Sequence, residues 1–175
     1  MATIRQASAE DIGALYAVSS AMGAAVEKGY FERCLSEQEA GTRRVFVAEV
    51  SGHTSAGPGH TVAGYVFLNF MPGYSPFRRF GIPEIQDLSV IPTLRQQGIG
   101  GRLIDHCVEA ARMAGHAELG IGVGLHARFG AAQRLYVGRG FVPDGQGIVY
   151  DDEAVSAGEL RPVDDLLALK MTKKL

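Results

Sequence analysis

The sequence contains no tryptophan and only two cysteines, and aromatic residues make up 8% of its 175 residues. Two cysteines cannot supply the disulfide framework of a small secreted protein, so we expect Cys34 and Cys107 to be buried free thiols in a reducing cytoplasm. No apolar run approaches the roughly 20 residues that span a bilayer, and residues 1–5 lack the pattern of a signal peptide. The sequence therefore predicts a cytoplasmic protein without a membrane partner.

An excess of positive charge is also missing, because the formal net charge is −2. A nucleic-acid-binding domain usually carries a basic face, so we expect no nucleic-acid partner. The five histidines show no metal-ligand spacing, and we expect no metal. With 46% hydrophobic and 21% charged residues, the chain is long enough for one domain with a sizeable core, and we assign residues 1–175 to it.

Hydrophobic periodicity predicts an alternation of helices and strands along the chain. Ser8, with an acidic residue three positions later, has the pattern of a helix N-cap. Residues 51–60 are predicted to be the loop of a hairpin. Residues 71–83 are predicted to be an ordered loop whose aromatics pack near the active centre, or alternatively a hairpin tip or dimer contact. The expected strands cover 3–7, 44–50, 61–70, 84–91, 117–123, 141–142 and 165–171, and the expected helices about 8–20, 26–40, 100–114 and 131–138.

The stretch at residues 87–103 is the most informative, because an apolar run ends there in a polar turn and a glycine pair opens a helix. Glycine lacks a Cβ, so an anion can approach the backbone, and the first amides of a helix have no partner within it. Arg95 adds a permanent cation. The stretch predicts a phosphate-binding turn, with an ordinary strand-to-helix turn as the alternative. A dinucleotide fingerprint is disfavoured, because it needs glycine where Leu103 stands.

The pattern Arg95-x-x-Gly98-x-Gly100, after a Leu-x-Val-x-Pro strand, resembles the acetyl-CoA signature of the GNAT N-acetyltransferases. Leu135-Tyr136 followed by Gly140-Phe141 is similar to a second signature of that family, and the predicted element order coincides with it over about residues 3–172. The resemblance implies the GNAT acyl-CoA N-acyltransferase fold, a mixed α/β (α+β) fold with a central, mostly antiparallel sheet and helices on both faces. It also implies acetyl-CoA as cosubstrate, held by Leu88, Ser89, Val90, Arg95, Gln96, Gln97, Gly98, Ile99, Gly100, Gly101 and Ala132.

Acetyl transfer to an amine needs a base, since an alkyl ammonium is mostly charged at neutral pH. Glu84 lies fourteen residues before Gly98, where some GNAT enzymes place a glutamate that acts through water. Asp87 is the rival, expected on the opposite face of the strand, and either carboxylate could instead be salt-bridged or solvated. The resemblance makes Tyr136 the proton donor to the sulfur of coenzyme A, with a core tyrosine as the alternative. Phe129 stands where the family often has an asparagine.

These patterns predict an N-acetyltransferase that moves an acetyl group from acetyl-CoA to a primary amine of a small molecule, by direct attack in a ternary complex. A non-catalytic acyl-CoA-binding sensor and a protein or peptide N-acetyltransferase are the alternatives. The acidic connection over residues 144–165, together with Glu84, favours a cationic acceptor. The glycines of residues 120–124 predict close approach by a ligand or a neighbour. A homodimer is compatible with the family.

Overall fold

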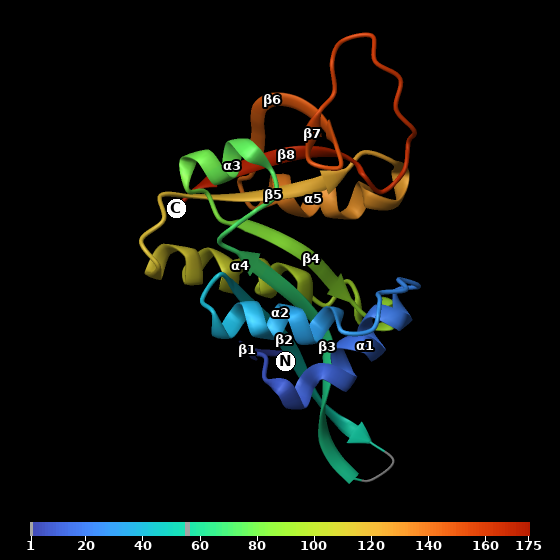
Figure 1. Ribbon diagram of the computed structural model, residues 1–175. Coiled ribbons are helices and arrows are strands. Elements are labelled where there is room, and N and C mark those ends of the chain that lie inside the picture. The colour runs from blue at the N-terminus through green and yellow to red at the C-terminus, as the bar shows by residue number, and fades with distance from the viewer. Residues whose placement is uncertain (1, 55–56) are drawn as a thin grey trace. The chain divides into compact units, whose positions relative to one another are not determined.

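The computed structural model describes residues 2–54 and 57–175 (Figure 1). The chain forms two compact units, the first made of residues 1–69 and 86–110 and the second of residues 70–85 and 111–175. Strand β4 (Glu84–Val90) and helix α4 (Ile99–Met113) each contribute residues to both units. Within the described residues, no helix is long and apolar enough to cross a membrane. The assignment of residues 1–175 to a single domain stays a prediction.

The first unit contains an antiparallel arrangement of β1 (Thr3–Gln6), β2 (Arg43–Thr54) and β3 (Gly57–Asn69), followed by β4 in the strand order. Its helices are α1 (Ile12–Ala21), α2 (Tyr30–Glu39) and most of α4. Strands β2 and β3 extend into the predicted hairpin loop as far as the Thr54–Gly57 pair, and residues 55–56 lie outside the described residues. Helix α2 starts four residues later than predicted, after Gly29 in the left-handed region.

Helices cover both faces of the sheet in this unit. Val45 and Val47 of β2 are fully buried in a cluster with α1 and α2 residues such as Leu15 and Phe31. The intervening residue, Phe46, lies edge-on against His106 of α4, with 4.6 Å between ring centroids. Because successive side chains of a strand point to opposite faces, α1 and α2 cover one face and α4 covers the other.

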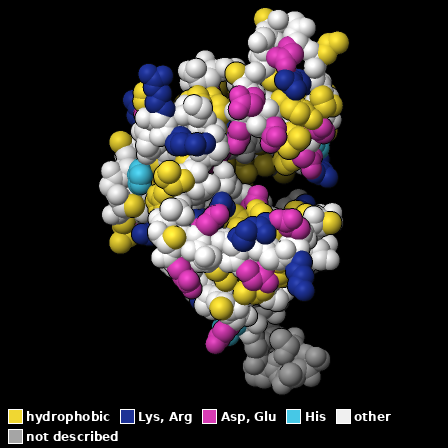
Figure 2. All heavy atoms as spheres, in the orientation of Figure 1, with side chains coloured by type: hydrophobic (Ala, Val, Ile, Leu, Met, Phe, Trp, Pro, Cys, Tyr) yellow, Lys and Arg dark blue, Asp and Glu magenta, His cyan; other side chains and the backbone are white. Residues whose placement is uncertain are grey.

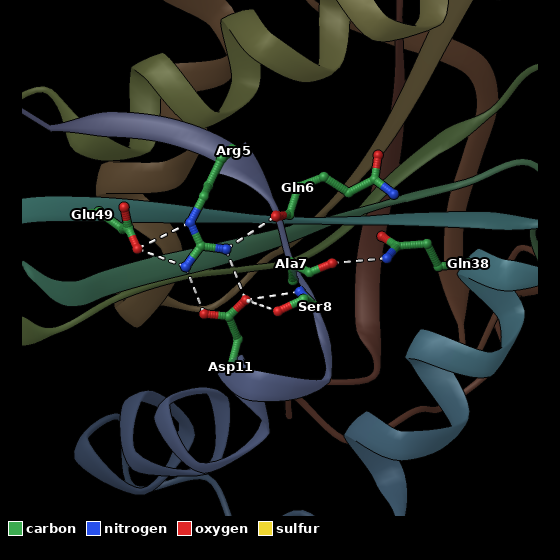
Figure 3. Close-up of polar contacts among 7 residues, drawn as sticks. All are labelled: Arg5, Gln6, Ala7, Ser8, Asp11, Gln38 and Glu49. Carbon is green, nitrogen blue, oxygen red and sulfur yellow. Dashed lines mark hydrogen bonds and ion pairs between the residues drawn. The ribbon is translucent and has the colours of Figure 1, made fainter.

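An ion-pair network ties the N-terminal strand to its surroundings (Figure 3). Arg5 donates to both carboxylate oxygens of Asp11, at 2.7 and 2.8 Å, and to Glu49 on β2 at 2.6 Å. Ser8 and Asp11 form the capping box that the sequence predicts, at the start of a 3-10 turn (Ala9–Asp11) leading into α1. The hydrogen bonds from Arg5 hold the pKa of the Asp11 carboxyl below its ordinary value, outweighing the effect of burial.

The second unit is built on β5 (Glu118–Gly124), β6 (Val142–Tyr150), β7 (Glu153–Ala154) and β8 (Leu167–Lys174), with helices α3 (Ser75–Phe80) and α5 (Gly130–Gly138). The strand order is β4-β5-β8-β6-β7. The first residues of β4 pair in parallel with β5, and every other pairing here is antiparallel. The fold is therefore mixed α/β with a mostly antiparallel sheet and flanking helices, which confirms the predicted class.

Two predictions in the second unit were wrong in detail. Residues 71–83 are not only a loop, because Ser75–Phe80 forms α3, with Pro76 in its first turn. Proline fits that position, where the amide has no helical acceptor. The acidic connection is shorter than predicted, because β6 extends through it to Tyr150 and turns into β7 at Asp151 and Asp152, both with positive φ.

The glycines of β5 are explained by side chains of the same unit. A Cβ on Gly120 would come within 2.2 Å of the Phe77 ring, and one on Gly124 within 2.2 Å of the Phe129 ring. Of the two predicted alternatives, a ligand or a neighbouring part of the chain, it is neighbouring side chains that lie close to these glycines. Phe77 is fully buried, as expected for an aromatic of the 71–83 segment, whereas Phe80 is 72% exposed. Cys34 and Cys107 are both buried and free, as predicted.

Candidate active site

The turn before α4 has the backbone that the phosphate-binding prediction requires. Gln96 and Gly98 have positive φ angles of 60° and 78°, which turn the chain sharply after Arg95. At the start of α4, the Arg102 amide donates to the Gly98 carbonyl at 3.1 Å. The amides of Ile99 and Gly100 precede it and have no acceptor within the helix. A 15-residue helix thus presents its positive end at an exposed, glycine-containing turn.

The Arg95 side chain is exposed and bends back over its own strand. Its Nε donates to the Val90 carbonyl at 3.1 Å, and one terminal nitrogen lies 2.8 Å from the Met22 sulfur. Both contacts are with uncharged groups, and no carboxylate in the described part of the chain pairs with Arg95. Its guanidinium can therefore attract an anion. Of the other predicted binding residues here, Gln96, Gln97 and Gly98 are exposed, Ile99 and Gly101 are buried, and Gly100 is half-buried.

The strand before the turn is half-buried at Leu88, Ser89 and Val90. Gly64 of β3 lies against it, and a Cβ there would meet the Ser89 carbonyl oxygen at 2.4 Å. The Ile91 amide donates to the Ala63 carbonyl at 2.9 Å, so the end of this segment is bonded to β3. The predicted binding residues Leu88 to Gly101 therefore lie on one continuous stretch of the first unit.

Asp87 interrupts the extended conformation of β4. Its φ is +51°, in the left-handed region, where aspartate is tolerated better than most residues. The prediction that Asp87 and Glu84 point to opposite faces relied on strict alternation of side chains along β4. That alternation does not continue through Asp87, because its backbone is left-handed. The Asp87 side chain is exposed, and its Oδ2 accepts a short hydrogen bond from the hydroxyl of Tyr30 at the start of α2.

Glu84 has a different environment. It is 1% exposed, and Lys170 of β8 donates to its Oε1 at 2.6 Å. The same ammonium lies 2.5 Å from Oδ1 of Asp152 and 5.2 Å from the centroid of the Tyr74 ring. Burial lowers the pKa of Lys170, but the two carboxylates outweigh burial and raise it overall, so the lysine stays charged. Glu84 is thus a buried, salt-bridged carboxylate, and its role as a base stays a prediction.

Tyr136 and Ala132 lie four residues apart on α5, and therefore on one face of that helix. Tyr136 is 6% exposed, and burial raises the pKa of its phenol to about 12. No residue in the described part of the chain hydrogen-bonds the hydroxyl, yet the oxygen is not sealed from solvent. The side chain therefore combines a buried ring with a hydroxyl that is free to donate.

A pocket of about 430 Å³ lies in the second unit. The 71–83 segment lines it with Phe77, Phe80 and Ile82, and the acidic connection contributes Asp144. Asp144 already accepts hydrogen bonds from the Tyr74 hydroxyl at 2.8 Å and from the Gln146 amide at 2.9 Å. Figure 2 shows acidic and hydrophobic side chains side by side over the segment that follows β7. The two segments predicted to shape the acceptor site thus line one pocket, whose ligand stays a prediction.

Sequence reasoning missed Tyr30 and Lys170, whose contacts join residues 57 and 86 positions apart. No local pattern indicates these contacts, because each partner is brought near by the fold and not by the neighbouring sequence. Among the residues whose side chains are described, no three histidines, cysteines or carboxylates cluster in a way that would hold a metal ion.

Solved structures with the same fold include several acetyltransferases. The ribosomal-protein-alanine N-acetyltransferase of Brucella melitensis is 22% identical, with a TM-score of 0.71 and 99% of each chain covered. A GNAT family acetyltransferase of Elizabethkingia anophelis, solved with acetyl-CoA bound, is 18% identical, with a TM-score of 0.64 and 99% of this chain and 98% of that chain covered. An N-acetyltransferase of Staphylococcus aureus Mu50 is 18% identical, with a TM-score of 0.68 and the same coverage.

Among curated proteins, none matches the sequence significantly. The model of the acetyltransferase (GNAT) domain, however, matches residues 41–143, which is more than half of the chain and includes β4, the turn before α4, and Tyr136. This match confirms the resemblance seen in the sequence, and it shows that the chain belongs to the GNAT acetyltransferase family.

Proposed function

We propose that the protein transfers the acetyl group of acetyl-CoA to the primary amine of a small molecule, by direct attack in a ternary complex. The observation that carries this proposal is the turn at residues 95–101, where left-handed backbone, helix amides and a cation meet at an exposed surface. A diphosphate is the anion that such a turn suits. The acetyl-CoA bound to the Elizabethkingia anophelis enzyme supports the choice of donor.

The reaction consumes an ammonium ion and a thioester and yields an amide, a free thiol and one proton. The amine nitrogen must first lose a proton to become a nucleophile, and a C–N bond then forms as the C–S bond breaks. We assign Asp87 as the proton acceptor in preference to Glu84. The Asp87 carboxylate is exposed and has only a neutral hydroxyl as its described partner, whereas Glu84 is buried against the Lys170 ammonium.

Tyr136 supplies a hydrogen bond to the departing sulfur. Because its pKa is about 12, the phenol is protonated throughout the neutral range. The phenol is a weaker acid than an alkyl thiol, whose pKa is about 8.5. Complete transfer of the phenol proton to the thiolate would therefore cost roughly 5 kcal/mol. We therefore assign it a donated hydrogen bond that offsets charge on the sulfur, with the thiol's proton coming finally from the amine.

The acceptor is proposed to be cationic. Asp151 and Glu153 are exposed and flank Asp152 at the β6–β7 turn, and this region carries more acidic than basic side chains. Asp152 itself is already paired with Lys170, so neutralising it would disturb the fold as well as the charge. A small molecule is favoured over a protein because the pocket that β6 lines with Asp144 and Gln146 has a volume of about 430 Å³, which is typical of a small-ligand site.

A panel of primary amines, assayed by release of free coenzyme A, tests this function. The wild-type protein should release thiol with at least one cationic amine, and Tyr136→Phe should lower kcat about tenfold or more while calorimetry shows unchanged binding of acetyl-CoA. Binding without thiol release from any amine would identify a non-catalytic sensor. Absence of coenzyme A binding at millimolar concentration by the folded protein would refute the proposal altogether.

A further inference from the structure

We infer that Tyr30 is a positioning residue for acetyl transfer, which holds the Asp87 carboxylate so that its second oxygen takes the proton of the amine. The inference rests on the proposed function and on Asp87 as its proton acceptor. Both residues belong to the first unit, and the hydroxyl of Tyr30 donates directly to Asp87 Oδ2.

Asp87 needs such a partner because no surrounding structure buries its side chain and restricts its movement. The side chain projects from a left-handed residue in an otherwise extended strand and is exposed to solvent. An exposed carboxylate rotates among several rotamers, and each unproductive one lowers the fraction of molecules that can react. The hydrogen bond from Tyr30 fixes Oδ2. Oδ1 receives no hydrogen bond from any residue in the described part of the chain, and it is left as the proton-accepting atom.

Tyr30 is itself held firmly. Its ring lies edge-on to Phe31, with 5.2 Å between centroids, and tilted against Phe67 at 6.3 Å. Phe31 and Phe67 are both fully buried in the cluster beneath α1 and α2. Burial and the nearby Asp87 charge raise the pKa of the Tyr30 phenol, so it remains a donor across the range in which the enzyme would work. Packing against the core therefore fixes the position of the Tyr30 hydroxyl, which donates to the exposed Asp87 carboxylate.

Tyr16 provides a matched control. It is another tyrosine of the same cluster, with its ring edge-on to Phe31 at 4.8 Å. Its hydroxyl also bonds a carboxylate, donating to Glu32 at 2.7 Å, and it accepts the Gly29 amide at 2.8 Å. None of its hydrogen bonds reaches β4. Tyr16→Phe therefore removes a hydroxyl from the same aromatic cluster without touching Asp87.

The test compares Tyr30→Phe, Asp87→Asn, the double variant and Tyr16→Phe for kcat, for both KM values and for melting temperature. Phenylalanine keeps the packed ring, and asparagine keeps both the size and the tolerance of the left-handed backbone. We expect Tyr30→Phe to lower kcat about 10- to 100-fold, as for loss of a hydrogen bond to a charged group. Asp87→Asn should lower it about 100-fold or more. The double variant should match Asp87→Asn, and the KM for acetyl-CoA should not change.

The inference is overturned if Tyr30→Phe lowers kcat no more than Tyr16→Phe does, or if its effect multiplies with that of Asp87→Asn. It also fails if Asp87→Asn keeps the wild-type kcat, although acetyl transfer by the wild-type protein would then still stand. Should the wild-type protein release no thiol with any amine, the proposed function falls, and the role of Tyr30 falls with it. Comparable melting temperatures of the two tyrosine variants would separate positioning from stability.

Discussion

Replacing Lys170 by methionine should destabilise the fold strongly. The lysine is 5% exposed, and it is the cation that neutralises Glu84, which is 1% exposed. Methionine has a similar length but no charge, so the Glu84 carboxylate would remain buried without its ammonium partner. Breaking a buried ion pair from one side typically costs about 3–5 kcal/mol. The other partner, Asp152, has a side chain 37% exposed and can recover hydration, so it adds little to this cost.

The loss is large compared with the stability of a typical domain, which is about 5–15 kcal/mol. For a chain of this size, about 1 kcal/mol corresponds to about 2–4 °C in melting temperature, so we expect a decrease of roughly 6–20 °C. Because the pKa of Lys170 is raised above its ordinary 10.5, its contribution is complete below that pH and disappears only as the pH rises through the raised value. Urea unfolding at pH 7 therefore reports the whole effect.

Two further variants make the experiment decisive. Lys174 is an exposed residue of the same strand, and Lys174→Met should change the free energy of unfolding by no more than about 0.5 kcal/mol. Glu84→Gln combined with Lys170→Met removes both buried charges and should recover much of the loss, because the only charge left without its partner is then the partly exposed Asp152 carboxylate of this cluster. A cost below about 1 kcal/mol for Lys170→Met, or a double variant no more stable than the single one, would refute the reasoning.

Two other predictions concern stability. Asp11→Asn should cost about 1–2 kcal/mol at pH 7, since Arg5 keeps one charged partner and is 38% exposed. Because the folded-state pKa of Asp11 lies below its ordinary 3.8, the difference from wild type should persist above that pH and shrink as the pH falls below it, which urea unfolding at several pH values would show. Gly120→Ala should cost about 1–3 kcal/mol by displacing the Phe77 ring. Gly138→Ala, where a Cβ meets nothing within 4 Å, should cost nothing, and equal melting temperatures for the two alanine variants would contradict the packing argument.

Local patterns predicted those parts of the fold whose signals lie close together in the sequence. The capping box at Ser8 and Asp11 is such a case, because both partners are three residues apart and the chemistry is complete within one turn. The turn before α4 is another, since its glycines and Arg95 occupy a single short stretch. Helix α3 was missed because the prolines and glycines of residues 71–83 indicated a loop, although a proline directly after Ser75 also fits a helix start.

The environments of the candidate catalytic carboxylates could not be predicted in this way. Glu84 owes its burial and its ion pair to Lys170, which follows 86 positions later on a different strand. Asp87 owes its direction to a left-handed backbone within a strand, which no composition rule indicates, and to Tyr30, which precedes it by 57 positions. Pairing over such separations depends on strand register and helix packing, and these are properties of the whole unit.

The left-handed conformation of Asp87 also limits what protein engineering can place there. Glutamate would preserve the carboxylate, but a longer side chain gains no local hydrogen bond to offset a conformation that costs an ordinary residue about 1–2 kcal/mol. Asparagine and glycine fit the backbone but abolish the charge. In a saturation library selected for folded protein, asparagine and glycine would outnumber glutamate at position 87. Aspartate is the one residue that supplies the charge and also tolerates the left-handed backbone.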